Sequence, residues 1–222
     1  MKKKEIVLFL DKLKRLFKDD NKALNALKLI RSKIDELENN VFPKSSETSR
    51  KNSDTLSLPD EIEGIPGAFA IFSDGACRGN PGPGAWCTII QDNSGKIVFE
   101  MTGVDLVTTN NKMELTGAIQ GVNGLLEYLK TKPESPSTIH LYSDSKYVID
   151  GITKWAHGWK RRGWKKADNK IPENLELWKE FDELSQKTGI SIDFIWVKGH
   201  SGHPQNEYCD ELANNALDAA GY

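Results

Sequence analysis

The 222-residue chain has few cysteines and no long apolar run, and both shortages exclude classes of protein. Its three cysteines, Cys77, Cys87 and Cys209, are odd in number, lie far apart and include no CxxC pair. This argues against a disulfide framework or a cysteine-ligated zinc site and favours a reducing compartment. No stretch approaches the ~18 apolar residues of a membrane span, since the run at 6–10 is broken at Asp11. We therefore expect a cytoplasmic protein with no membrane partner.

The chain also lacks a strong excess of one charge, because 30 Lys and Arg stand against 32 Asp and Glu, for a net charge of −2. Such a balance does not by itself indicate a nucleic-acid-binding protein, so the local distribution matters more. Residues 154–170 depart from the average, with seven Lys or Arg and one Asp interleaved with Trp155, Trp159 and Trp164. Charges this dense repel one another, and a bound phosphate backbone would relieve that repulsion. A charged helix that packs its tryptophans on a core is the simpler interpretation.

Apolar periodicity and composition divide the chain into three parts. Residues 1–39 carry two stripes at three- and four-residue steps, which predict an N-terminal helical hairpin. Residues 40–63 are rich in serine, other polar residues and breakers, which predict a flexible linker. Residues 64–222 form the predicted main domain. Eleven Lys or Arg against seven Asp or Glu over residues 1–40 are typical of a solvated face and only a weak indication of nucleic-acid binding.

The main domain alternates strand and helix patterns. We expect strands at 67–73, 84–92, 96–103, 137–144 and 190–199, and helices at 110–130, 145–155, 172–187 and 206–220. The turn signal NSG at 93–95 joins the second and third strands as a hairpin. This order predicts an α/β fold with a five-stranded mixed sheet flanked by helices.

Four acidic residues occupy suggestive places in this pattern. Asp74 ends the first predicted strand and Asp144 ends the fourth, and ligands gather at the carboxyl ends of such strands. Taken singly, the aspartates suit turns, Glu114 suits a helix dipole, and Asp210 suits an exposed helix face shared with Asn206. Taken together, carboxylates without cysteine or paired histidine fit Mg²⁺ or Mn²⁺. Two such ions about 4 Å apart can clamp the reacting oxygens of a phosphodiester, although spacing alone does not show that the four acids converge.

Five motifs make the pattern specific. In chain order they read SDGACRGNPGPGAW (73–86), TTNNKMEL (108–115), YSDSKYV (142–148), GWKRRGWKKADNKIPENLELW (158–178) and WVKGHSGHPQNEYCDELA (196–213). Together they resemble type 1 ribonuclease H from about residue 67 to 219. The resemblance implies the ribonuclease H fold, with antiparallel first three strands and parallel contacts between strands 1, 4 and 5. It also implies endonucleolytic hydrolysis of the RNA strand of RNA–DNA hybrids with two Mg²⁺ ions, for which Mn²⁺ can substitute. The products would carry 5′-phosphate and 3′-hydroxyl ends, with roles in primer and R-loop removal.

The resemblance also assigns roles to residues. It implies catalytic metal ligands at Asp74, Glu114, Asp144 and Asp210, and a loop histidine, His200, that moves protons or assists product release. It implies contacts with the hybrid by Cys77 and Asn80 in the minor groove, by Asn110 and Asn111, and by Thr109 at a DNA-strand phosphate. It also implies a basic protrusion that contacts the hybrid through Trp155, Lys160, Arg161, Arg162, Trp164 and Lys165. We expect Asn206 to orient a water or the loop beside the hybrid. At Val107 the sequence departs from the family, because a basic residue often stands there beside the phosphate.

Two other hypotheses stay open at this point. A hybrid-binding module without cleavage would not require four carboxylates and His200, and an integrase or resolvase nuclease of the same fold would not require the basic segment. We expect the catalytic domain to be monomeric. The predicted hairpin at 1–39 lacks Trp and Tyr, unlike the aromatic-rich hybrid-binding domain of some family members, and is left as a binder of nucleic acid or of protein.

Overall fold

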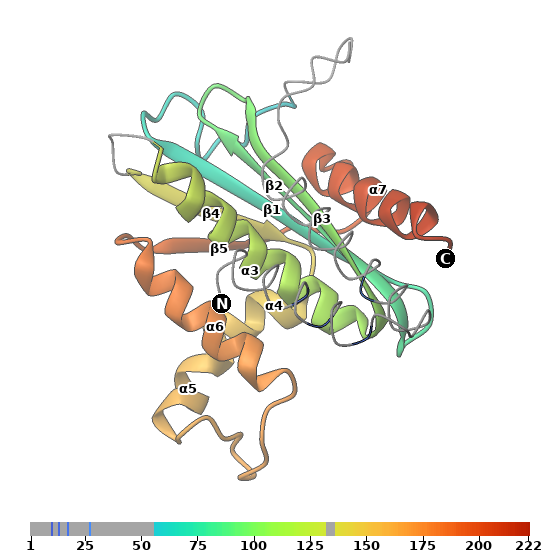
Figure 1. The fold of residues 1–222 in the computed structure, drawn as a ribbon. Coiled ribbons are helices and arrows are strands. Elements are labelled where there is room, and N and C mark those ends of the chain that lie inside the picture. The colour runs from blue at the N-terminus through green and yellow to red at the C-terminus, as the bar shows by residue number, and fades with distance from the viewer. Residues whose placement is uncertain (1–9, 11–12, 14–16, 18–26, 28–55, 132–135) are drawn as a thin grey trace. The chain divides into compact units, whose positions relative to one another are not determined.

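The computed structural model describes residues 10, 13, 17, 27, 56–131 and 136–222 (Figure 1). The chain separates into two compact units, Met1–Ser49 and Arg50–Tyr222, and the helices and strands labelled in Figure 1 belong to the second. Apart from four single residues, the predicted hairpin at 1–39 lies outside the described residues, as does the predicted linker as far as residue 55.

A mixed sheet of five strands forms the centre of the second unit, in the order β3-β2-β1-β4-β5. The first three strands are antiparallel neighbours, whereas the last two run parallel to β1. Their bounds are Ala68–Cys77 for β1, Gly82–Asp92 for β2, Ile97–Thr108 for β3, Thr138–Ser143 for β4 and Ile192–Trp196 for β5. The predicted α/β fold, with this mixture of antiparallel and parallel neighbours, is confirmed.

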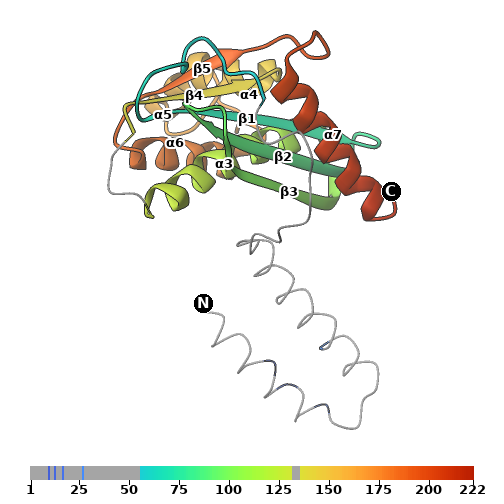
Figure 2. The same ribbon diagram turned by 90° about the horizontal axis from the view of Figure 1, so that it is seen from above.

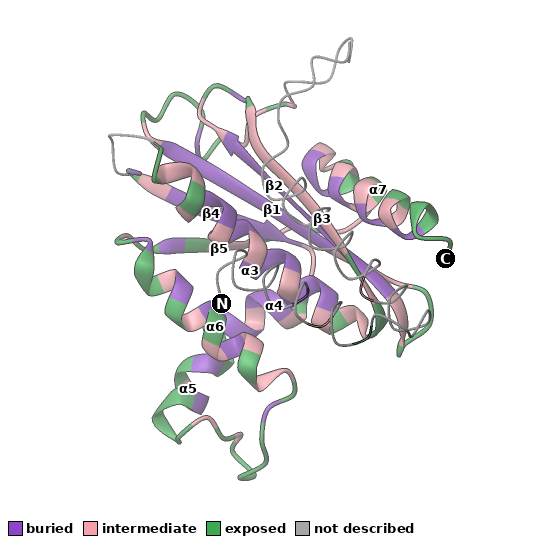
Figure 3. Ribbon diagram, in the orientation of Figure 1, coloured by how far each residue is buried: buried purple, intermediate pink, exposed green. Residues whose placement is uncertain are grey.

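Helices cover both faces of the sheet, which explains why β1 is apolar without alternation and is buried along most of its length (Figure 3). Ile71 packs among the helices of one face, while Phe72 packs against α7 on the other. Figure 1 shows α3 in front of the strands and running in nearly their direction, and Figure 2 shows α7 passing over the strands. The helices of the first face are α3 (Asn110–Leu129), α4 (Lys146–Asp150), α5 (Ala156–Arg161) and α6 (Leu175–Lys187), and α7 is Pro204–Ala219. No helix among the described residues is long and apolar enough to cross a bilayer.

The helix predicted at 145–155 continues to Arg161 because a π-helical turn, η1 (Gly151–Trp155), joins α4 to α5. A Cβ atom at Gly151 would lie 2.1 Å from the indole of Trp178, so the close packing of this turn requires glycine. Such a turn inserts an extra residue into the helix and changes the direction in which later side chains point. Lys154 lies within this turn, and the other basic residues of the segment 154–170 follow it.

Residues 56–63, which the sequence placed in the linker, pack against the domain instead. Ile62 is fully buried, and Leu56 joins the apolar cluster on the α7 face. The hydroxyl of Tyr142 donates a hydrogen bond to Glu61 Oε2 at 3.0 Å. Polar residues and breakers had suggested a linker, but the apolar side chains among them pack against the domain. The domain therefore includes these eight residues.

Candidate active site

Three carboxylates from three separate elements meet beside the centre of the sheet. Asp74 lies on β1, Glu114 on the first turns of α3, and Asp144 directly after β4. Each offers an oxygen within 4.8 Å of the oxygens offered by the other two. Within the part of the chain that the structure describes, this is the only group of three or more His, Cys, Asp or Glu side chains with such spacing.

The sheet register brings the two aspartates together. The parallel pairing of β1 with β4 ends at Phe72 and Tyr142, two residues before each aspartate. Asp74 nevertheless pairs with Cys87, because β1 continues its antiparallel pairing with β2 as far as residue 77. The expectation that Asp74 ends its strand is therefore wrong: it lies within β1, beyond the last residue of β1 that pairs with β4.

Glycines allow the other elements to approach these acids. A Cβ atom on Gly75 would lie 2.4 Å from the backbone nitrogen of Glu114, so α3 can pack this close only against glycine. The Gly75 N–H also donates to Asp74 Oδ1 at 2.7 Å. In the loop after β5, a Cβ atom on Gly199 would lie 2.3 Å from Asp144 Oδ2. No pattern in the sequence indicates either of these close contacts.

Burial and mutual repulsion disfavour the charged forms of two of the acids. Asp74 is 7% exposed, and its burial, together with the charge of Asp144, raises its pKa to about 7. Burial, together with the charge of Asp74, raises the pKa of Glu114 well above its ordinary value. Asp210 adds to the effect on Asp74. These are the shifts expected where like charges are held together without a compensating cation.

The donor set fits a hard divalent cation. Glu114 Oε1 accepts a hydrogen bond from Asn110 Nδ2 at 3.3 Å, whereas Glu114 Oε2 is buried without a hydrogen-bond partner. A buried carboxylate oxygen in that state costs free energy that a bound cation would offset. Oxygen ligands of this kind suit Mg²⁺ or Mn²⁺ better than zinc.

Hydrogen bonds from β5 and α7 hold Asp144 in place. Asn206 Nδ2 donates to Asp144 Oδ2 at 3.3 Å, and Trp196 Nε1 donates to the Asp144 carbonyl oxygen at 2.9 Å. Asn206 is 4% exposed and contacts this carboxylate, whereas we had expected it to orient a water or the loop beside the hybrid. The contact of Trp196 was not predicted, and no sequence signal marks it.

Asp210 and His200 lie at the edge of the cluster. Asp210, on α7, is outside the group of three, and its Oδ1 accepts a hydrogen bond from Asn214 Nδ2 at 2.8 Å. His200 lies in the loop between β5 and α7 with a left-handed φ of 49°. Its side chain is 82% exposed, with Nδ1 4.0 Å from Asp210 Oδ2. The assigned roles of both residues stay predictions.

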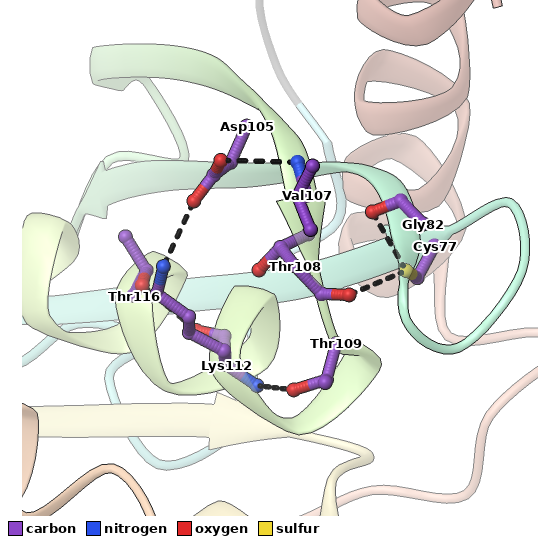
Figure 4. A network of polar contacts seen from close by, with 8 residues as sticks. All are labelled: Cys77, Gly82, Asp105, Val107, Thr108, Thr109, Lys112 and Thr116. Carbon is purple, nitrogen blue, oxygen red and sulfur yellow. Dashed lines mark hydrogen bonds and ion pairs between the residues drawn. The ribbon is translucent and has the colours of Figure 1, made fainter.

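The turn after β1 and the start of α3 form one surface next to the carboxylates. Asn80 Oδ1 accepts a hydrogen bond from the Asn110 N–H at 3.3 Å. Thr109 caps α3, because its Oγ1 accepts from the Lys112 N–H at 3.3 Å. The Cys77 thiol lies 3.7 Å from the Thr108 carbonyl oxygen (Figure 4). Five of the predicted hybrid contacts, Cys77, Asn80, Thr109, Asn110 and Asn111, therefore lie on these two connected segments.

The basic segment has a part that packs on the core and a part that faces solvent. Trp159 is 8% exposed and packs on the core, while Trp155, with its ring 5.9 Å away, is 38% exposed. Trp164 is half-buried against the same core. Lys160 pairs with Asp182 of α6 at 2.6 Å. The predicted basic side chains all face solvent, namely Lys160, Arg161, Arg162 and Lys165.

Known proteins resemble this chain over the same region. The RNase H family model matches residues 66–218. A ribonuclease H of Rhizobium meliloti is 47% identical over 148 residues, which are 67% of this chain and 89% of that protein. The crystal structure of LC9-RNase H1, a type 1 RNase H with the type 2 active-site motif, is 32% identical, with a TM-score of 0.57 over 68% of this chain and 72% of that one.

A further solved structure supports the fold alone. LC11-RNase H1, solved in complex with an RNA/DNA hybrid, is 23% identical, with a TM-score of 0.55 over 69% of this chain and 99% of that one. The family model covers nearly all of the sheet and its helices, and the bacterial relative is almost half identical across them. On this evidence the chain belongs to the RNase H family.

Proposed function

We propose that this protein is a divalent-metal-dependent endonuclease that hydrolyses the RNA strand of RNA–DNA hybrids at the cluster of Asp74, Glu114 and Asp144. Membership of the RNase H family supports the hydrolysis of hybrids. The observation that carries the proposal is the convergence of three carboxylates from separate elements, one with a buried oxygen that lacks a partner. A protein that only bound hybrids would gain nothing from this costly arrangement.

The three clustered carboxylates, with Asp210 as a fourth ligand, would hold two Mg²⁺ ions, for which Mn²⁺ can substitute. When bound, such ions lower the pKa of water and stabilise charge on the phosphate and on the leaving oxygen. Side chains of the protein orient the ligands beforehand: Asn110 positions Glu114, and Asn206 positions Asp144. His200 is exposed beside Asp210, where its imidazole would transfer a proton or assist product release.

We further propose that two surfaces hold the hybrid. The turn after β1 and the start of α3 contact the minor groove through Cys77, Asn80, Thr109, Asn110 and Asn111. The basic segment contacts the DNA strand through Trp155, Lys160, Arg161, Arg162, Trp164 and Lys165. Exposed cations that repel one another support this role, because a phosphate backbone would offset their charge.

The remaining parts of the proposal concern the whole chain. The catalytic domain acts as a monomer, the segment 1–39 binds nucleic acid or protein, and the biological substrates are RNA primers and R-loops. The family is the support for primers and R-loops as substrates. Removal of residues 1–55, which spares the packed residues from 56 on, would separate the contribution of the N-terminal segment from that of the domain.

The test uses three end-labelled duplexes of one sequence, RNA–DNA, RNA–RNA and DNA–DNA, each with Mg²⁺ or with EDTA. We expect cleavage of the RNA strand of the hybrid alone, only with Mg²⁺, and 5′-phosphate and 3′-hydroxyl ends on the fragments. Ligation of the fragments without prior treatment checks those ends. Equal cleavage of all three duplexes would refute the substrate assignment.

A further inference from the structure

A charge pair links the start of α3 to the end of β3 (Figure 4). Lys112 Nζ donates to Asp105 Oδ2 at 2.8 Å, and the two side chains are 39% and 41% exposed. The hydrogen bond from Lys112 holds the pKa of Asp105 below its ordinary value, so the carboxyl group of Asp105 is ionised at neutral pH. Solvent reaches this pair, and a ligand could reach it too.

Local helix stability does not explain why a lysine stands here. Thr109 is the N-cap of α3, which makes Lys112 the third helical residue. Glu or Gln is favoured at that position, because it completes a capping box and complements the positive end of the helix dipole. A cation there costs about 0.3–1 kcal/mol, and an exposed ion pair returns only about 0–1 kcal/mol. A residue that breaks a local rule without a net gain indicates a functional use.

The position of Lys112 near the carboxylate cluster indicates what that functional use is. It lies two residues before Glu114 on the same helix, while Asn110, on another side of the turn, contacts Glu114 directly. Leu106 and Val107, the two residues that follow Asp105, are 59% and 75% exposed and apolar. Lys112 is therefore a solvent-accessible cation on the helix that carries a catalytic carboxylate, beside a strand end that carries no other positive charge.

We propose that Lys112 binds a backbone phosphate of the hybrid, and that Asp105 competes with this phosphate for the same ammonium group. The inference rests on the proposed function, since the duplex lies here only if it is cleaved at the neighbouring cluster. In the free protein the carboxylate of Asp105 takes a hydrogen bond that the phosphate would take, and it repels the incoming negative charge. Asp105 thus orients the ammonium group and also lowers the affinity for nucleic acid.

The test compares Asp105→Asn, Lys112→Gln and the double variant in hybrid binding, by fluorescence anisotropy in EDTA. Lys112→Gln should bind about 3- to 10-fold more weakly, and its slope of log K against log salt should be shallower by about 0.9. Asp105→Asn should bind about 2- to 5-fold more tightly, because it frees the ammonium group and removes a repelling charge. The double variant should bind more tightly than Lys112→Gln, but by less than Asp105→Asn gains over the wild type, since only part of the effect of Asp105 acts through Lys112. Lys130→Gln, which removes the pair with Glu127 at the other end of α3, is the matched control and should bind like the wild type.

A purely structural pair would behave differently. Both single variants would then unfold at lower urea concentrations, while affinity and salt slope would stay at wild-type values, and that result would overturn the inference. Lys112→Arg keeps the charge and should restore the salt slope; a slope that stays shallow despite normal folding would contradict a phosphate contact.

Two further measurements identify which strand of the hybrid Lys112 contacts and separate this inference from the proposed function. Uncharged methylphosphonates replace the phosphates of one strand at a time. On the contacted strand they should abolish the difference in hybrid affinity between Lys112→Gln and the wild type. A difference in affinity that persists whichever strand is modified would overturn the inference. Cleavage of the hybrid by the wild type is measured on the same preparation. If the wild type cleaves the hybrid but Lys112→Gln binds it normally, only the present inference fails; absence of cleavage would refute the proposed function.

Discussion

Asp74→Asn should stabilise the metal-free protein at alkaline pH while abolishing its activity. The ordinary pKa of this side chain is 3.8, and burial beside Asp144 raises it to about 7. Between these values the folded protein holds a proton that the unfolded chain has lost, so the free energy of unfolding falls as the pH rises from about 4 to about 7. An asparagine carries no charge at any pH and avoids this loss.

The magnitude follows from the two pKa values. One pKa unit corresponds to about 1.4 kcal/mol, so the ionised Asp74 costs the folded state up to about 4 kcal/mol at pH 8. At pH 5.5 the folded protein keeps the proton, and the cost falls to about 2 kcal/mol. Glu114 acts in the same direction, because its pKa is raised too, in part by the charge of Asp74. The free energy of unfolding of Asp74→Asn should therefore exceed that of the wild type by about 2–4 kcal/mol at pH 8, and this excess should be about 2 kcal/mol smaller at pH 5.5.

Urea unfolding in EDTA at the two pH values measures these differences. Mg²⁺ at pH 8 should stabilise the wild type, because it binds the folded state, and should stabilise Asp74→Asn much less. The reasoning would be refuted if the variant were less stable than the wild type at pH 8, or if the difference between the two proteins were the same at both pH values.

Three further predictions concern activity, binding and packing. His200→Ala should lower turnover by about 10–10³-fold without abolishing it, because the imidazole only assists; complete inactivity of a folded variant would give His200 a larger role. Replacement of the exposed cations Lys160, Arg161, Arg162 and Lys165 by alanine should make the salt slope of hybrid binding shallower by roughly 3–4, at about 0.9 per contact, and an unchanged slope would show that another surface holds the hybrid. Gly75→Ala should destabilise the protein by about 1–3 kcal/mol and slow cleavage, because the new methyl group displaces α3 and Glu114; wild-type stability in urea would show that the helix can yield without cost.

Much of the fold could be predicted from the sequence because its elements follow simple patterns. The buried run of β1 and the apolar stripe of α3 are long and periodic, and the corresponding strands and helices appear near the expected places. The extent of η1 and α5 was missed, because the fit of Gly151 against Trp178 depends on a residue 27 positions away. The packing of residues 56–63 was missed because their composition is that of a linker, while Ile62 is buried by tertiary contacts.

The candidate site could be predicted only in part. Sequence patterns and family resemblance single out Asp74, Glu114 and Asp144, but their convergence depends on where the pairing of β1 with β4 ends. The contact between Asn206 and Asp144, like that between Lys112 and Asp105, joins residues that are far apart in sequence or on different elements, and no periodicity indicates either. Such pairs become visible only once the sheet register and the helix positions are fixed.

Cleavage of the labelled RNA strand of a hybrid, measured across Mg²⁺ concentrations, tests the central claim most directly. The variants are Asp74→Asn, Glu114→Gln and Asp144→Asn, with Glu183→Gln, an exposed carboxylate of α6, as the control. We expect the wild type and the control to cleave with the same Mg²⁺ dependence, and each cluster variant to lose at least about 10³-fold in rate while still binding the hybrid. Near-normal Mg²⁺-dependent turnover by Asp74→Asn would contradict the assignment of this cluster as the active site.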